Sequence, residues 1–216
     1  MALLYINKVP SSLRTAFQNE VISICTDLGI ANPDWLMLVI KAESNFKTNA
    51  KNGKSTATGL IQFLESTAND LGTTTAKLRL MNHVEQLVYV REYLRRLIIE
   101  KGKPQNAYDL YFLVHSKKGF EKPDSYVMYS RGSLAYDTNP LDYDKNGAVT
   151  VSEIKTYLNK NLPLTYNKAN LYKSSSTGSS TNTIIIIGLI AVFGTATYYL
   201  AFKNGFQYLK AVIFKK

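Results

Sequence analysis

The chain is poor in cysteine, with Cys25 as the single one among its 216 residues. One cysteine cannot form a disulfide within the chain, so a disulfide-stapled scaffold is excluded. Cys25 lies in an apolar pattern with Val21, Ile24 and Leu28, and we interpret it as a small buried hydrophobic residue and not as a nucleophile. A hydrophobic core must therefore hold the fold, and the length suits one ordinary domain with appendages.

Dense runs of one charge are missing as well. Lysine and arginine total 26 against 16 aspartate and glutamate, which gives a net charge of +10. The excess is spread along the chain and forms no basic stripe, so nucleic acid is not the expected partner. A diffuse positive charge favours polyanions in general, including cell-wall polymers and anionic lipid headgroups.

The N-terminus lacks the charged segment and the long apolar run of a signal peptide, so we expect no such leader. An internal repeat is not evident. The alternation of apolar and polar residues that is typical of strands is rare in residues 1–135. This part of the chain is therefore predicted to be mainly α.

Helix start and stop signals divide residues 1–135. Ser11 is a capping residue, and Gly29 is a helix-ending residue. Asn32 followed by Pro33 is a typical helix start, and Asn82 with Glu85 forms a capping box. We expect helices over residues 11–28, 33–43, 59–71, 82–99 and 107–114, with a polar loop over residues 49–58.

Glu43 is a candidate catalytic acid because it ends an apolar helix beside Phe46 and just before a polar loop. A carboxylic acid that donates a proton near neutral pH needs a raised pKa. Apolar neighbours raise the pKa by desolvation, and the negative end of a helix dipole acts in the same direction. The alternative is a solvated glutamate in a last helical turn, and the residue's own chemistry leaves that alternative open.

The residues that follow Glu43 favour catalysis. Glu43-Ser44 is followed by Ser55-Thr-Ala-Thr-Gly-Leu-Ile-Gln-Phe63, then by Thr67 and Leu71-Gly72. Over about residues 31–135 this order resembles the soluble lytic transglycosylase family of the goose-type lysozyme-like superfamily. That family's pattern is Glu-Ser, a loop, Ala-x-Gly-Leu-Met-Gln, then Thr and Leu-Gly. The resemblance implies that Glu43 is the catalytic acid and that the substrate is contacted by Ser44, Ile61, Gln62 and Phe63.

The family's third motif, Ala-Tyr-Asn, is replaced here by Asp109-Leu-Tyr111-Phe-Leu-Val-His115. This segment is similar to phage and prophage members of the family. Either Tyr111 or His115 can supply a hydrogen-bonding group near Glu43, and we favour Tyr111. The alternative for His115 is a surface histidine at a helix end.

The resemblance implies cleavage between N-acetylmuramic acid and N-acetylglucosamine with a 1,6-anhydro product. One carboxylate suffices for that reaction, whereas hydrolysis normally uses two. Glu65 and Asp70 are the nearest candidates for a second carboxylate, and we interpret both as solvated helix residues. A lysozyme-type hydrolase on the same fold, and a non-catalytic peptidoglycan-binding membrane scaffold, are the alternative functions.

Residues 142–153 fit the twelve-residue EF-hand loop. The expected Ca²⁺ ligands are oxygens from Asp142, Asp144, Asn146, Ala148, Thr150 and Glu153, and Gly147 makes the turn. A second loop of this kind is missing from the sequence, so a structural role is favoured over a sensing role. The alternative is a vestigial acidic turn.

Residues 184–202 are uncharged and mostly apolar. As a helix they would measure about 28 Å, close to the hydrocarbon thickness of a bilayer. More lysines follow this segment than precede it, which favours a C-terminus on the cytoplasm-like side. The sequence therefore predicts a single-pass membrane anchor after a Ser/Thr-rich linker.

The expected architecture is a mainly α, lysozyme-like catalytic domain with C-terminal appendages. The parts are a catalytic domain over 1–135, an EF-hand-like segment over 136–165, a linker over 166–183, a transmembrane helix over 184–202 and a basic amphipathic tail over 203–216. An anchored wall-cutting enzyme suits a bacteriophage virion that carries a membrane, where other virion proteins are possible partners. A prophage or conjugation-type wall enzyme is the alternative.

Overall fold

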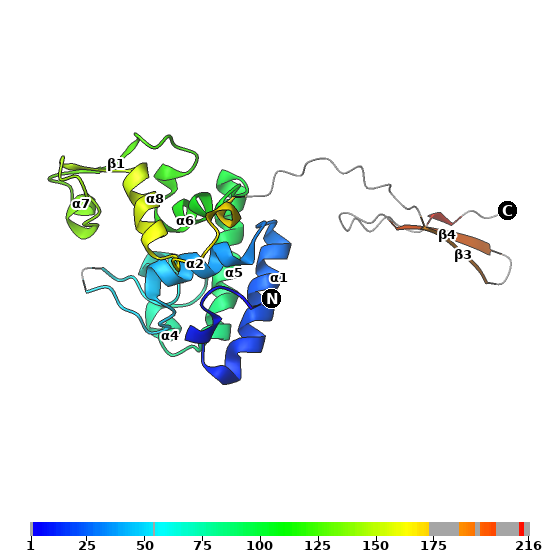
Figure 1. Cartoon of the computed structure of the whole chain (residues 1–216). Helices are drawn as coiled ribbons and strands as arrows, with labels where there is room; N and C mark the ends of the chain where they lie inside the picture. Colours follow the sequence, from blue (N-terminus) through cyan, green and yellow to red (C-terminus); the bar gives the residue numbers. More distant parts are fainter. Residues whose placement is uncertain (1, 54, 173–185, 193–194, 202–211, 214–216) are drawn as a thin grey trace. The chain divides into compact units, whose positions relative to one another are not determined.

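The computed structural model describes residues 2–53, 55–172, 186–192, 195–201 and 212–213. Two compact units divide the chain, residues 1–174 and residues 175–216. Figure 1 shows that helices dominate the first unit. Its principal helices are α1 (Arg14–Leu28), α2 (Pro33–Ser44), α3 (Glu65–Asp70), α4 (Thr75–Leu78), α5 (His83–Lys101), α6 (Ala107–His115), α7 (Leu134–Thr138) and α8 (Val151–Lys160). Short 3-10 turns cover Ile6–Lys8 (η1), Ser11–Leu13 (η2), Lys117–Gly119 (η3) and Lys168–Leu171 (η4).

The local signals place most helix ends where the sequence predicts them. The Asn32 side chain accepts a hydrogen bond from the Asp34 backbone at the start of α2, and the capping box of Asn82 and Glu85 is present at the start of α5. Helix α1 ends at Gly29, which has a φ of 69°. A positive φ favours glycine, because glycine has no Cβ to clash with the backbone.

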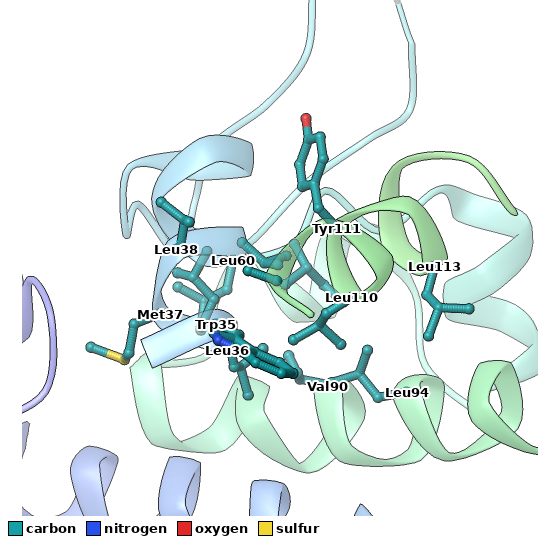
Figure 2. Packing of buried hydrophobic residues seen from close by; sticks show 14 of the residues in the cluster. Trp35, Leu36, Met37, Leu38, Leu60, Val90, Leu94, Leu110, Tyr111 and Leu113 are labelled. Carbon is teal, nitrogen blue, oxygen red and sulfur yellow. The ribbon is translucent and has the colours of Figure 1, made fainter. Parts of the chain in front are cut away.

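The core of the first unit lies between α1, α2, α5 and α6. Trp35 and Leu36 of α2 are fully buried, as are Val90 and Leu94 of α5, and Figure 2 shows them packed with Leu110 of α6. Cys25 is 1% exposed, and burial raises the pKa of its thiol to about 12. The prediction that Cys25 is a buried residue of the core is therefore confirmed.

The helix predicted over residues 59–71 is wrong in its first half. Gly59 and Gln62 have φ values of 78° and 56°, which no α-helix contains. Residues Gly59–Gln62 form a turn, and α3 covers Glu65–Asp70. Leu60, Ile61 and Phe63 are buried, but they lie in or directly after this turn and not in a helix.

The first unit continues beyond the boundary predicted between residues 135 and 136. Strand β1 (Val127–Ser130) pairs antiparallel with β2 (Ala148–Thr150), so the hairpin spans that boundary. In α8, Val151, Ile154 and Leu158 are buried and belong to the same core as α2 and α6. The apolar face of α8 thus packs the predicted EF-hand-like segment against the helices before it in the chain.

Residues 161–172, here called the C-terminal strap, return to α2. The Asn170 carbonyl accepts hydrogen bonds from Trp35 Nε1 at 2.7 Å and from Asn32 Nδ2 at 3.1 Å. Leu171 is 1% exposed, and Asn161 accepts a hydrogen bond from the Tyr5 hydroxyl. The predicted linker over 166–183 is therefore wrong for residues 166–172, and residues 173–183 lie outside the described part.

The second unit contains β3 (Ile186–Val192), β4 (Thr195–Ala201) and β5 (Val212–Ile213) in the order β3-β4-β5. Strands β3 and β4 are antiparallel, with Ile187 opposite Leu200. This differs from the helix predicted over 184–202, and β-branched isoleucine and threonine favour strands. Within the described residues, no helix has the length and apolar character needed to cross a membrane. Val212–Ile213 also differs from the predicted helical tail, whose other residues lie outside the described part.

Candidate active site

Glu43 lies in the last turn of α2, where the backbone changes direction. The next residues, Asn45 and Phe46, have positive φ values of 53° and 66°. This conformation is strained for residues other than glycine, and surrounding contacts must hold it. The Phe46 ring is 2% exposed and packs edge-on against Phe17 at 6.2 Å, and the Phe46 carbonyl lies 2.9 Å from His83 Nε2. The core therefore fixes the point at which the chain leaves Glu43.

A cavity of about 860 Å³ lies in front of Glu43. Six of the residues predicted for the site line it, namely Glu43, Ile61, Gln62, Phe63, Tyr111 and His115. Figure 2 shows the Tyr111 side chain pointing away from Leu110, the core residue beside it on α6. Ser44 is the exception, because it is buried and its hydroxyl donates to the Ile40 carbonyl at 3.2 Å. Ser44 is therefore a buried residue of α2 and does not line the cavity, in contrast to the predicted substrate contact.

The turn that presents Ile61 and Gln62 is held by Gln86 of α5, which the sequence analysis missed. Gln86 is fully buried. Its Oε1 accepts from the Leu60 backbone at 2.9 Å, and its Nε2 donates to the carbonyls of Thr48 and Leu78. A Cβ on Gly59 would lie 2.7 Å from Gln86 Oε1, so glycine is required there for the close approach as well as for its φ.

The environment of Glu43 matches a proton donor. Its side chain is 13% exposed, and its buried Oε1 has no hydrogen-bond partner among the residues that the structure describes. Burial raises the pKa of Glu43 to about 7, against a smaller opposing effect from the Tyr111 hydroxyl. A buried carboxyl resists losing its proton because the charged form is poorly solvated. Near neutral pH, Glu43 can therefore both donate and accept a proton.

Three tyrosines that the sequence analysis missed also line the cavity, namely Tyr93 of α5, Tyr129 of β1 and Tyr157 of α8. The Tyr157 hydroxyl donates to the carbonyl of Ala42, the neighbour of Glu43, at 2.8 Å. This contact joins α8 to the end of α2 across 115 residues of sequence. No spacing rule links positions so far apart, so the sequence offered no signal for it.

A second carboxylate does not line this cavity within the part of the chain that the structure describes. The Glu65 carboxylate accepts hydrogen bonds from the Thr75 backbone and hydroxyl. Asp70 lines a separate cavity of about 350 Å³. The interpretation as solvated helix residues fits the exposed Asp70, whereas Glu65 is half-buried and hydrogen-bonded, and neither residue lines the cavity of Glu43.

Residues 27–108 match the family model described as the transglycosylase SLT domain. The match covers less than half of the chain. The match supports a lytic transglycosylase-type enzyme that acts on peptidoglycan, and the mainly helical first unit is consistent with the lysozyme-like fold of that domain. A search of curated proteins found no match.

The matched SLT domain includes Glu43 and the turn at Gln62, and it ends before several residues of the cavity. Tyr111, His115, Tyr129 and Tyr157 all follow residue 108. The segment over residues 134–141 also follows it and forms one wall, with Leu134, Ala135, Thr138, Asn139, Pro140 and Leu141. The cavity is thus built from the SLT domain and from the C-terminal part of the first unit.

The predicted calcium ligands begin directly after that wall. One ligand oxygen each from Asp142, Asp144 and Glu153 can lie within 4.8 Å of one another. The Asp142 carboxylate accepts from the backbones of Asn146 and Gly147. Gly147 has a φ of 93° and makes the turn. Oxygen donors of this kind suit Ca²⁺, and they are the residues that could hold it.

Proposed function

We propose that the chain cleaves the β-1,4 bond between N-acetylmuramic acid and N-acetylglucosamine in peptidoglycan, and that it leaves a 1,6-anhydro end. The observation that carries the proposal is the state of Glu43. It is the one carboxylate that lines the cavity among the described residues, and burial raises its pKa to about 7. A single group with this pKa suits a reaction in which the same residue acts first as acid and then as base.

The proposed reaction has two steps. Protonated Glu43 gives its proton to the glycosidic oxygen as the C1–O bond breaks, and the N-acetylglucosamine side leaves with a free 4-hydroxyl. The acetamido group of the muramic residue stabilises the positive charge at C1. The Glu43 carboxylate then takes the proton of the C6 hydroxyl as that oxygen bonds to C1. The proton count balances, and no water is consumed.

Mass spectrometry of the fragments released from purified peptidoglycan tests this function. Lytic transglycosylase action gives muramic ends that are one water lighter than the reducing ends left by a hydrolase. We expect the anhydro ends to predominate. Reducing ends would indicate the alternative, a lysozyme-type hydrolase, and no release would indicate a binding scaffold.

We also propose that residues 184–202 anchor the enzyme to a membrane, in the virion of a membrane-containing bacteriophage. The segment is uncharged, and lysines follow it at 203, 210, 215 and 216. Its backbone would need internal hydrogen bonds in lipid, which a helix supplies in full, so we expect lipid to favour a helix over the strands. A tether would confine wall damage to the site of entry. Detection of the chain in purified virions tests this role.

We propose further that Ca²⁺ binds the loop over residues 142–153. Asp142, Asp144, Asn146, Thr150 and Glu153 would supply side-chain oxygens, and Ala148 a carbonyl. The donor set supports this, because its carboxylates are close together and carry like charges that a divalent cation would neutralise. Bound calcium would stabilise the segment next to the cavity wall and would take no part in the chemistry.

Calcium should therefore raise the melting temperature of residues 1–174. A ligand that binds only the folded state adds about 2.7 kcal/mol at 100 times its Kd. Glu153→Gln should remove most of the gain, whereas Asp124→Asn, which changes an acid outside the loop, should keep it. Calorimetry across a calcium titration and in chelator measures this. A melting curve that does not respond to calcium would make the loop a vestigial turn.

A further inference from the structure

A short chain of polar groups leads to the unpartnered oxygen of Glu43. His115 Nδ1 lies 3.9 Å from Glu43 Oε1, and the other ring nitrogen, Nε2, lies 3.1 Å from the Tyr129 hydroxyl. Tyr129 belongs to β1, outside the matched SLT domain. All three side chains line the same cavity. Tyr111 stacks on the His115 ring at 5.2 Å with an interplanar angle of 13°, which restrains the ring's orientation.

His115 is neutral in this setting. Burial lowers the pKa of His115 to about 4, so its contact with Glu43 is not an ion pair near neutral pH. A neutral imidazole has one nitrogen that donates and one that accepts. The group that bonds to one nitrogen therefore decides which way the other acts.

The Tyr129 hydroxyl is placed to determine which nitrogen of His115 carries the proton. Burial raises the pKa of the Tyr129 hydroxyl, and a hydrogen bond with the Ser116 side chain acts in the opposite direction, which is the effect of a donor on the phenol oxygen. If the oxygen accepts from Ser116, its proton is free to point at His115 Nε2. That nitrogen then accepts, and the imidazole proton lies on Nδ1, toward Glu43.

We propose that Tyr129 is a positioning residue that holds the His115 proton on Nδ1, so that His115 donates to the Glu43 carboxylate that forms during the reaction. The proposal rests on the proposed function of Glu43 as acid and base. The 3.9 Å separation is longer than a hydrogen bond, and catalytic contacts of this kind commonly shorten when substrate binds. The carboxylate in the middle of the reaction would then have a donor on its otherwise unpartnered oxygen.

The titratable groups around Glu43 have pKa values far from 7, so they do not overlap with its titration. The titratable side chains that act on it or contact it are Tyr93 of α5, Tyr111 and His115 of α6, Tyr129 of β1 and Tyr157 of α8. The pKa values of these tyrosines are raised above 10, and that of His115 is lowered to about 4. A change in activity near pH 7 therefore reports on Glu43.

Tyr129→Phe tests the proposal through kinetics. Without the phenol proton, His115 can move its own proton to Nε2 and turn a lone pair toward Glu43. The carboxylate is then disfavoured, so kcat should fall about 10- to 100-fold, the usual effect of losing a hydrogen bond to a charged group. The alkaline limb of the pH profile should move upward, and KM should stay unchanged. Tyr126→Phe removes a hydroxyl from a nearby exposed tyrosine and should change none of these.

Nitrogen NMR of the imidazole rings tests it without any variant. The chain has two histidines. His83 Nε2 contacts the Phe46 carbonyl, which can only accept, so His83 should carry its proton on Nε2. His115 should carry its proton on Nδ1 and lose that preference in Tyr129→Phe, and His83→Gln assigns the two signals.

Three results would overturn the role of Tyr129, and a fourth would contradict the function on which that role rests. A wild-type His115 with its proton on Nε2 overturns the role of Tyr129. An active wild type whose Tyr129→Phe variant keeps the same kcat and pH profile also overturns it. A lower kcat with an unshifted pH profile would show a purely structural role. A wild type that releases no fragments contradicts the proposed function instead.

Discussion

Glu43→Gln is expected to abolish glycan cleavage while it leaves the fold intact. The amide keeps the shape of the side chain and cannot deliver a proton. Loss of general acid catalysis typically costs about 10²- to 10⁴-fold, and more where one group serves as both acid and base. Release of soluble fragments from peptidoglycan measures the loss. Activity within a few-fold of the wild type would contradict the assignment of Glu43.

The same variant should be more stable than the wild type at pH 8. The pKa of Glu43 is about 7 in the fold against an ordinary value of 4.5, so the folded state holds a proton that the unfolded state has lost. The stability from this group is fully present below pH 4.5 and is lost as the pH rises to 7. The cost above pH 7 is on the order of 3 kcal/mol, and glutamine removes it.

Melting temperatures of the wild type and Glu43→Gln at pH 4 and pH 8 check this sign. The two should be similar at pH 4, and the variant should melt higher at pH 8. Glu121→Gln, a change at an exposed glutamate, should have little effect at either pH. A variant that melts below the wild type at pH 8 would show that Glu43 is not held in a desolvating site.

The full-length protein should partition with lipid vesicles and resist extraction by salt or carbonate, whereas residues 1–174 should stay in solution and still cut glycan. The apolar segment over 184–202 would bury far more hydrocarbon than one acyl chain, which alone binds marginally. Salt screens the lysines of the tail and not the apolar segment. The shorter chain keeps the whole first unit, including Glu43, Gln62 and Tyr111.

Two double variants separate the contributions of apolar surface and of charge to lipid binding. Val192→Lys with Thr195→Lys should release the protein, because a charge at the centre of a spanning segment costs about 2.5–3.5 kcal/mol. Lys215→Gln with Lys216→Gln should leave the binding intact. Release by salt alone would mean that the tail only contacts the lipid surface. A first unit that is inactive on soluble glycan would mean that the two parts are not independent.

The parts of the site that could be predicted from sequence are those encoded within a few residues. The cap at Asn32 and the end of α2 at Glu43 each depend on neighbouring residues, and the structure brings Glu43 and Gln62 to one cavity. Tyr129 and Tyr157 reach that cavity from β1 and α8, and their places depend on how distant elements pack. Local patterns carry no information about such pairings.

The errors have equally local causes. Residues 59–71 are apolar enough for a helix, and hydropathy does not reveal the positive φ of Gln62, which the contacts of the surrounding turn sustain. Ser44 follows Glu43 in the motif, yet adjacent residues on a helix point about 100° apart, so the two cannot face the same wall. For residues 184–202, length and hydropathy favour a helix, while β-branched side chains favour the strands that the structure contains.

The C-terminal strap determines how the C-terminal segment is connected mechanically to α2, the helix that carries Glu43. The Asn170 carbonyl is bonded to Trp35 and Asn32 at the beginning of α2, and Glu43 lies at the other end of the same helix. A pull on the tail would first load Tyr172, which pairs with Asn106 at the start of α6, and would then reach α2 at the end farther from the Glu43 carboxyl. In a tethered enzyme, the strap would bear tension before the cavity did, and the active site would keep its shape while the strap held.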